Sequence, residues 1–272
     1  MHLLAIDLDG TCLDSRDLLH ESTLLALRRA LDAGVTVVPT TGRNLLGVPK
    51  ALRMLPGVRY VITSNGAAVY DLQEDRTVYE RLIPCEQAAD LMERCRAHSA
   101  PQAVTIGPNI IDGDPFVAKL RHTHFHDFED SLLTRSLPDY VRDRGADVEK
   151  LHIFYLRKWK CDRILDLLRQ EPDISFSGTP GEHTEIVAAG VNKGGTLAHL
   201  CAMLGVAPED AAAIGDSDND VEMLRFAGHS FAMGSAPDYV RQAAKEETDD
   251  SDHDGVAHAV ERLLCKWTEE TA

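Results

Sequence analysis

Short apolar runs alternate with longer mixed stretches in the first third of the chain. Residues 3–6, 35–39 and 60–63 are nearly all apolar, which is typical of strands buried on both faces of a parallel sheet. The stretches between them, 22–33 and 44–54, are predicted helices. Strands that alternate with helices in this way predict an α/β fold with a parallel sheet.

The same alternation returns in the last third of the chain. We predict a helix over 192–204, a strand over 211–214, a helix over 221–226 and an extended run over 229–232, with two further helices at the end. Two such halves predict a Rossmann-like, doubly wound core that has helices on both faces of its sheet.

The middle of the chain follows a different pattern. Its predicted elements are two helices and three extended runs: 86–98, 159–170, 104–106, 150–156 and 174–177. Short strands and helices mixed in this way indicate an α+β insert within the α/β domain. We therefore expect a core domain formed by 1–83 and 184–272, and a cap domain formed by 84–183.

The chain is strongly acidic. Its 272 residues include 28 Lys and Arg against 44 Asp and Glu, so that the formal net charge is −16. Nucleic acid and anionic membrane surfaces should repel such a chain, and we expect neither as a partner. If the substrate is an anion, a local positive centre must overcome the field of the whole protein.

The sequence shows neither a predicted targeting signal nor closely spaced cysteine pairs. No apolar stretch approaches the ~20 residues of a membrane-spanning helix, and the first acid comes at Asp7 with no basic residues before it. The six cysteines are scattered without a CxxC pair, which is typical of reduced, mostly buried thiols. We expect a cytoplasmic protein, and the sequence leaves monomer and homodimer equally open.

Two carboxylates follow the first predicted strand, in the segment Asp7-Leu8-Asp9-Gly10-Thr11. In an open parallel sheet, ligands bind beyond the carboxyl ends of the strands, where this segment lies. Asp7 and Asp9 would face the same way on an extended backbone, and Gly10 lets the chain turn without an obstructing side chain. Such a pair can divide the roles of nucleophile and proton carrier, although a turn with two solvated acids has the same pattern.

The second predicted strand ends in Thr40-Thr41-Gly42-Arg43. A hydroxyl, a glycine and free amides at the start of a helix can bind phosphate, although this segment taken alone favours a simple helix cap by Thr41 or Asn44. Arg43 could contact a second anionic group of a substrate, or it could be a surface arginine.

The second half supplies a lysine and an acidic cluster. Lys193 stands at the start of a predicted helix, where a positive charge is unfavourable for the helix dipole. Its placement indicates a bound anion, although a solvated lysine would have the same pattern. Residues 215–220, Gly-Asp-Ser-Asp-Asn-Asp, follow a predicted strand and offer the oxygen ligands that hard divalent cations prefer. A calcium loop is excluded, because its sixth position would be Val221 rather than Gly and its twelfth Ala227 rather than Glu.

These segments together resemble the haloacid dehalogenase superfamily, and more narrowly its Cof-type phosphatases with a type IIB cap. The segments that carry the resemblance are DLDGT (7–11), TTGR (40–43), SNGA (64–67), the lysine of VNKGG (191–195), GDSDND (215–220), FAMGSA (231–236) and DGVA (254–257). The insert matches in size and position rather than by motif. The second aspartate distinguishes the phosphatases of the superfamily from its dehalogenases.

The resemblance implies a magnesium-dependent phosphohydrolase that cleaves a small phosphate monoester, such as a sugar phosphate or phosphoglycolate, through an aspartyl-phosphate. The implied catalytic residues are Asp7 as nucleophile, Asp9 as acid and base, Thr41 and Lys193. Substrate-binding positions are expected at Gly10, Gly42, Arg43, Asn65 and Asn219. Expected contacts to Mg²⁺ come from Asp7, Asp9 through its backbone carbonyl, and Asp216, with Asp220 close by. Cys12 departs from the family pattern, and we expect it to pack as a small apolar group or to confer sensitivity to oxidation.

Several alternatives remain open from the sequence. A phosphotransferase or phosphomutase would share the nucleophile, whereas a non-catalytic metabolite sensor would be expected to lack one of the four key residues. The cap carries candidates without a clear role: Thr179, His183 and Glu185 near the return to the core, and His122, His124 and His126, which alternate as on a strand. The physiological substrate does not follow from the sequence.

Overall fold

The computed structural model describes residues 1–96, 102–113, 132–155, 159–178 and 181–270. By its internal contacts the chain forms two compact units: unit 1 (Met1–Gly42, Val48–Val78 and Asn192–Ala272) and unit 2 (Arg43–Gly47 and Tyr79–Val191). The expected domain boundaries at 83/84 and 183/184 stay a prediction, because two compact units do not establish which segments fold as domains. None of the described helices is long and apolar enough to cross a membrane.

Unit 1 is built on a parallel sheet of five strands in the order β14-β13-β12-β1-β2. Its strands are β1 (Leu3–Ile6), β2 (Thr36–Pro39), β12 (Ala211–Gly215), β13 (His229–Ala232) and β14 (Glu246–Glu247). The central strands β1 and β12 are fully buried, which explains why they are uninterrupted apolar runs in the sequence.

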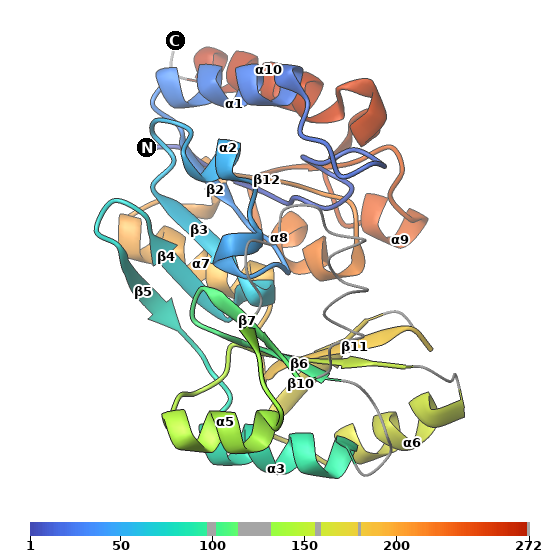
Figure 1. Cartoon of the computed structure of the whole chain (residues 1–272). Helices are drawn as coiled ribbons and strands as arrows, with labels where there is room; N and C mark the ends of the chain where they lie inside the picture. The colour runs from blue at the N-terminus through green and yellow to red at the C-terminus, as the bar shows by residue number, and fades with distance from the viewer. Residues whose placement is uncertain (97–101, 114–131, 156–158, 179–180, 271–272) are drawn as a thin grey trace. The chain divides into compact units, whose positions relative to one another are not determined.

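Helices cover both faces of this sheet. They are α1 (Glu21–Asp32), α7 (Lys193–Leu204), α8 (Val221–Phe226), α9 (Asp238–Arg241) and α10 (Gly255–Glu270). From β1 the chain crosses to β2 on one side, and from β12 it crosses to β13 on the other. Because such crossovers are right-handed, α1 and α8 must lie on opposite faces, and they pack there against α10 and α7 respectively (Figure 1).

A small three-stranded sheet adjoins β2. It contains β3 (Tyr60–Thr63), β4 (Ala68–Asp71) and β5 (Arg76–Glu80), and a single parallel bridge from Thr40 to Ile62 links it to the core. The single helix predicted over 44–54 is wrong. In its place are a 3₁₀ turn (Leu45–Gly47) and the short helix α2 (Lys50–Arg53), because Pro49 between them lacks the N–H that a continuous helix requires.

Unit 2 contains a mixed sheet of six strands in the order β10-β11-β9-β6-β7-β8. These strands are β6 (Gln102–Ile106), β7 (Asn109–Asp112), β8 (Leu132–Leu133), β9 (Lys150–Phe154), β10 (Ile174–Ser177) and β11 (His183–Ala188). The helices α3 (Cys85–Arg96), α5 (Leu137–Arg144) and α6 (Trp159–Leu168) lie on one side of it (Figure 1). The predicted fold class, a parallel α/β core with a separate α+β cap, is confirmed.

Candidate active site

The site forms where the strand order of unit 1 reverses. The chain leaves β1 toward β2 and leaves β12 toward β13, so the loops after these two neighbouring strands diverge, and this is where open α/β sheets bind their ligands. Asp7 is the first residue after β1, and Asp216 is the first after β12. The predicted convergence of these two segments at one edge of the sheet therefore has a direct topological cause.

A tight turn follows Asp7. The backbone N–H of Asp7 donates to Ile214 O at 3.0 Å, and Thr11 N–H donates back to Leu8 O at 3.2 Å. The strand β1 ends at Ile6 and the turn begins at Leu8, so the chain is not extended over the whole of 7–9 as the sequence argument assumed. Asp7 is buried, whereas Asp9 is exposed.

Gly10 is required within this turn. Its φ is +79°, which side chains with a Cβ rarely adopt, and a Cβ built there would lie 2.6 Å from Asp216 Oδ2. Glycine therefore lets the Asp7 turn approach the carboxylate of Asp216. The neighbouring Thr11 fixes that carboxylate, since its hydroxyl donates to Asp216 Oδ1 at 2.8 Å.

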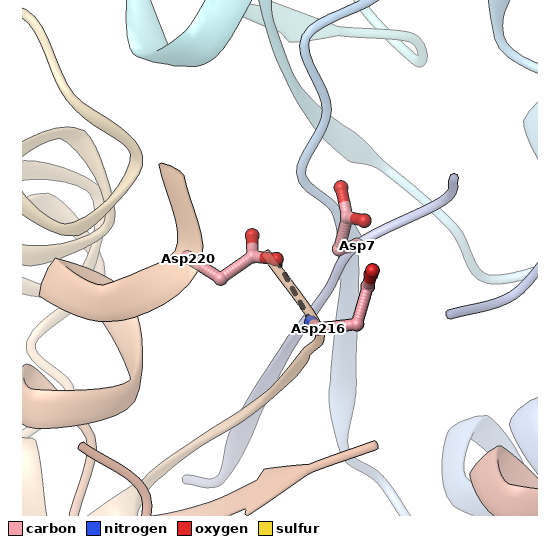
Figure 2. Close-up of side chains that lie close together, drawn as sticks. All are labelled: Asp7, Asp216 and Asp220. Carbon is pink, nitrogen blue, oxygen red and sulfur yellow. Dashed lines mark hydrogen bonds between the residues drawn. The ribbon is translucent and has the colours of Figure 1, made fainter. Parts of the chain in front are cut away.

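Three carboxylates meet beyond these strand ends. Asp7, Asp216 and Asp220 lie close together, and one oxygen of each lies within 4.8 Å of the others (Figure 2). Asp7 and Asp220 are buried, and Asp216 is partly buried.

Lys193 lies against this cluster. As the first residue of α7, it is only 1% exposed, and its Nζ donates to Asp7 Oδ1 at 2.5 Å and to Asp220 Oδ1 at 2.7 Å. Burial opposes its charge, but Asp220 and Asp7 outweigh that effect and raise the pKa of Lys193. Two carboxylates of the protein itself therefore lie against Lys193, and the bound anion expected from its position in the sequence stays a prediction.

Asp220 organises the acidic loop with its second oxygen. Asp220 Oδ2 accepts hydrogen bonds from the backbone N–H groups of Asp216 and Ser217, both at 3.0 Å. The Ser217 hydroxyl lies 3.3 Å from the same oxygen. Both carboxylate oxygens of Asp220 are therefore engaged, one with Lys193 and one with the loop that carries Asp216.

The carboxylates are held in an unfavourable environment for negative charge. Burial, followed by the charge of Asp220, raises the pKa of Asp7 well above its ordinary value, even though Lys193 acts in the opposite direction. The same two causes raise the pKa of Asp216 to about 6. Three carboxylates against one ammonium leave an excess of negative charge, and like charges ~4 Å apart repel by about 4 kcal/mol at an effective dielectric of 20.

The residues present fit a divalent cation. Hard cations such as Mg²⁺ and Ca²⁺ prefer carboxylate and carbonyl oxygens, and a second positive centre would relieve the repulsion that raises these pKa values. The cluster of Asp7, Asp216 and Asp220 is thus consistent with a metal site.

Thr41 and Gly42, which follow β2, lie in the same unit as the carboxylates. Thr41 is fully buried, and its N–H donates to Ile62 O at 2.9 Å. Gly42 approaches Asn65, whose Oδ1 accepts a hydrogen bond from Asn219 Nδ2 at 2.9 Å. Arg43 belongs to unit 2, where its Nη1 donates to Gly47 O at 3.1 Å.

The predicted cap residues are only partly described. His183 and Glu185 lie on β11 of unit 2, where Glu185 Oε1 accepts from the buried Lys150 Nζ at 2.7 Å. This ion pair gives Glu185 a structural partner. Thr179, His122, His124 and His126 lie outside the described residues.

Cys12 packs as a small buried group behind the site. Burial, together with the charges of Asp7 and Asp9, raises the pKa of its thiol well above the ordinary value. The thiol is therefore kept in its neutral form, which is unreactive toward oxidants, and this favours the packing role over sensitivity to oxidation.

Sequence reasoning missed two polar residues of the site. Thr11 and Ser217 were not singled out, because a hydroxyl that bonds a neighbouring carboxylate or loop leaves no periodic signal. Both lie inside quoted motifs, DLDGT and GDSDND, so their closeness to acidic residues in the sequence was the available signal.

The chain matches a family of known proteins over almost its whole length. The model of the haloacid dehalogenase-like hydrolases matches residues 4–260. The 5-amino-6-(5-phospho-D-ribitylamino)uracil phosphatase YcsE of Bacillus subtilis is 30% identical over 267 residues, which are 95% of this chain and 94% of that protein.

Solved structures share the fold. A haloacid dehalogenase-like hydrolase from Bacteroides thetaiotaomicron has a TM-score of 0.85 and 28% identity, and the match covers 96% of this chain and 99% of that one. The subclass IIB sugar phosphatase BT4131 has a TM-score of 0.80 at 23% identity, over 97% and 99% of the two chains. The chain therefore belongs to the haloacid dehalogenase-like hydrolase family and is a phosphatase of that superfamily, as its motifs predicted.

Proposed function

We propose that the chain is a magnesium-dependent phosphohydrolase that uses Asp7 to cleave a small phosphate monoester. The observation that carries the proposal is the buried ammonium of Lys193, 2.5 Å from Asp7 and 2.7 Å from Asp220, beside the carboxylate of Asp216. A nucleophile, a fixed positive charge and a cation site within a few ångströms are what phosphoryl transfer requires.

In the first step, an Asp7 carboxylate oxygen attacks phosphorus. An Asp7 O–P bond forms while the bond from phosphorus to the leaving oxygen breaks, and that oxygen takes its proton from Asp9. The product alcohol departs, and the phosphoryl group remains on Asp7 as an acyl phosphate. The exposure of Asp9 suits this role, because a proton carrier must exchange protons with solvent between steps.

In the second step, water attacks the same phosphorus. Asp9, now ionised, removes a proton from the water, a new P–O bond forms, and the bond to Asp7 breaks. Inorganic phosphate leaves, and Asp7 and Asp9 return to their starting states. One carboxylate thus serves as nucleophile, and the other serves first as acid and then as base.

Thr41 and Lys193 would hold the transferred phosphoryl oxygens. Lys193 can do so because its charge is maintained by its raised pKa, and because its amine already lies against the nucleophile. The bound cation would supply further charge stabilisation. We assign its ligands to the carboxylates of Asp7 and Asp216 and the backbone carbonyl of Asp9, and we assign Asp220 to the support of Lys193 and the loop, since both its oxygens are engaged.

The proposed substrate is a small phosphorylated metabolite. The relatives include a phosphatase of a phosphorylated ribitylaminouracil, and a sugar phosphatase shares the fold. We propose that unit 2 acts as the cap, and that its residues select the alcohol that leaves. At 30% identity, the substrate of that relative is not assigned to this chain.

Phosphate release from a panel of phosphorylated metabolites tests the proposal. With Mg²⁺ we expect steady release of inorganic phosphate from at least one member, none in excess EDTA, and recovery when Mg²⁺ is restored. Asp7→Asn should remove turnover while the circular dichroism spectrum stays unchanged. Undiminished turnover in EDTA, or wild-type rates for Asp7→Asn, would overturn the proposal, and a phosphorylated acceptor in place of free phosphate would identify a transferase.

A further inference from the structure

A left-handed turn stands beside the site. Directly after β3, Ser64, Asn65 and Gly66 have φ angles of +50°, +59° and +102°. Two of these residues carry a Cβ, and a left-handed conformation costs such a residue roughly 1–2 kcal/mol. Strain of this kind persists only where the surrounding structure holds it in place, so the contacts of the turn indicate what it is for.

The turn first contacts the Thr41 segment. The backbone N–H of Asn65 donates to Thr41 O at 3.0 Å. The next residue, Gly42, passes so close that a Cβ built on it would lie 2.9 Å from Asn65 Oδ1. The left-handed backbone at Asn65 therefore fixes the position of the segment proposed to bind phosphate.

The same turn also contacts the start of α7. The Thr196 hydroxyl donates to Gly66 O at 2.7 Å, and a Cβ on Gly66 would lie 2.5 Å from Asn192 O. Asn192 caps this helix by accepting from Gly195 N–H at 2.7 Å. Lys193 is the first residue of this helix. The close contact of Gly66 with Asn192 therefore fixes the position of Lys193 relative to the turn.

A third set of contacts reaches the acidic loop. Asn65 Oδ1 accepts from Asn219 Nδ2 at 2.9 Å, and Asn219 Oδ1 accepts from the Ser217 hydroxyl at 2.8 Å. Ser217 in turn bonds Asp220. A continuous chain of hydrogen bonds thus runs from the turn into the loop that carries Asp216.

We propose that Asn65 is a positioning residue, and that the turn Ser64–Gly66 holds three segments of the site in register: Thr41–Gly42, the start of α7, and the loop 215–220. This proposal rests on the proposed function, and it replaces the expectation that Asn65 and Asn219 bind substrate. The side-chain amide of Asn219 donates to Asn65, and the backbone N–H of Asn65 donates to Thr41 O. Both groups therefore bind other segments of the protein.

Three variants separate the two contributions of Asn65, its left-handed backbone and its side-chain hydrogen bond to Asn219. Asn65→Gly keeps the left-handed backbone and removes the acceptor of Asn219, Asn65→Ala also strains the backbone, and Asn219→Ala removes the donor. Asp75→Gly is the matched control, since Asp75 is also left-handed (φ +47°) but lies exposed in the turn before β5. Circular dichroism and thermal unfolding confirm that each variant folds.

We measure kcat and KM for p-nitrophenyl phosphate, and Mg²⁺ binding by isothermal titration calorimetry. Loss of a residue that orients metal ligands typically lowers activity or metal affinity by about 10- to 100-fold. We expect losses of that size for Asn65→Gly in kcat and in Mg²⁺ affinity, a larger loss for Asn65→Ala, and a KM within about twofold of wild type. Asp75→Gly should match wild type, and Asn65→Gly combined with Asn219→Ala should lose less than the sum of the two single losses, because both remove the same hydrogen bond.

A raised KM with unchanged kcat and Mg²⁺ affinity would make Asn65 a substrate ligand and overturn the proposal. Additive losses in the double variant would overturn it too, because they would show that Asn65 and Asn219 act separately. These outcomes are distinct from failure of the proposed function. In that case the wild-type chain itself would release no phosphate, and the calorimetric comparison would still decide whether Asn65 positions the metal loop.

Discussion

At the scale of single residues, the site contains a position where neighbouring atoms leave no space for any side chain larger than that of glycine. Gly10 shows this most clearly, because two separate constraints act on it. Its φ of +79° disfavours any residue with a Cβ, and its neighbour Asp216 leaves no room for one. The two constraints can be separated, since Gly34 has a similar φ of +82° with nothing within 4 Å of a built Cβ.

We predict that Gly10→Ala and Gly34→Ala lose similar stability but differ in activity. Each should lower the free energy of unfolding by about 1–2 kcal/mol, the cost of a left-handed alanine. Only Gly10→Ala should lose phosphate release, by at least about tenfold, because its methyl group displaces the Asp216 carboxylate. Urea unfolding and steady-state kinetics measure both effects. Equal activity in the two variants would contradict the close approach of Gly10 to Asp216.

The sequence largely predicted which residues lie in the site. It did not predict which contacts these residues make. Asp7, Lys193 and Asp216 could be placed together because each borders a strand or helix whose end the sequence marks. The exposure of Asp9 and the pairing of Asn65 with Asn219 could not be predicted. Both follow from turns whose φ angles depend on contacts with segments far away in the chain.

At the scale of elements, the loop between β1 and α1 is held by one buried carboxylate. Asp14 Oδ1 accepts from the N–H groups of Arg16 and Leu18, both at 2.8 Å, and Asp14 Oδ2 lies 2.9 Å from His20 Nε2. Burial acts to raise its pKa, but the hydrogen bonds from Leu18, His20 and Arg16 outweigh it and lower the pKa of Asp14 well below its ordinary value.

We predict that this carboxylate stabilises the fold in a pH-dependent way. Because the folded pKa is the lower one, the stabilisation is complete above the unfolded pKa of about 4 and is lost as the pH falls below it. Asp14→Asn should therefore unfold about 1–3 kcal/mol more easily at pH 7, with a difference that shrinks below pH ~4. Urea unfolding at several pH values checks this. A difference that grows with acidity would show that the charge of Asp14 is not what stabilises the loop.

Four strands were predicted to the residue: β1, β3, β10 and β13. In β1 and β3 the prediction rested on nearly uninterrupted apolar runs, which have few other interpretations. The strands β7 and β11 and the helix α5 of unit 2 were missed. In β11, His183, Thr184 and Glu185 interrupt the apolar pattern, and its pairing with β9 and β10 depends on partners distant in the chain.

At the scale of the whole molecule, a net charge of −16 surrounds a site that already holds an excess of carboxylates. The protein without metal therefore carries repulsion that a bound cation removes. Screening by ordinary salt acts on the surface charges, whereas a cation bound between Asp7 and Asp216 acts on buried ones. The two contributions can be measured apart.

We predict that Mg²⁺ stabilises the chain beyond the effect of ionic strength. At a concentration 100 times its dissociation constant, a ligand that binds only the folded state contributes about 2.7 kcal/mol. The midpoint temperature of thermal unfolding should thus be higher in MgCl₂ than in NaCl of equal ionic strength. Asp216→Asn should remove this difference. If MgCl₂ and NaCl gave the same midpoint for the wild type, the metal site would be in doubt.

The organisation of the molecule was predictable to the level of its two parts. The alternation of strands and helices predicted the doubly wound core, and the break in that pattern predicted the α+β insert. The identity of the substrate was not, because the insert has no motif and its polar residues are distributed over strands whose order follows from tertiary pairing. Its ion pair of Lys150 with Glu185, for example, joins residues 35 positions apart.

The most direct test of the account is to trap the phosphoryl group on Asp7. The chain is mixed with an active phosphate ester and Mg²⁺, quenched in acid during the first turnover, and treated with borohydride, which reduces an aspartyl phosphate to homoserine. Mass spectrometry of the N-terminal peptide should find homoserine at position 7 in this sample and aspartate in an unreacted control. Release of phosphate with Asp7 unmodified at every quench time, and the phosphoryl group on another side chain, would contradict the account.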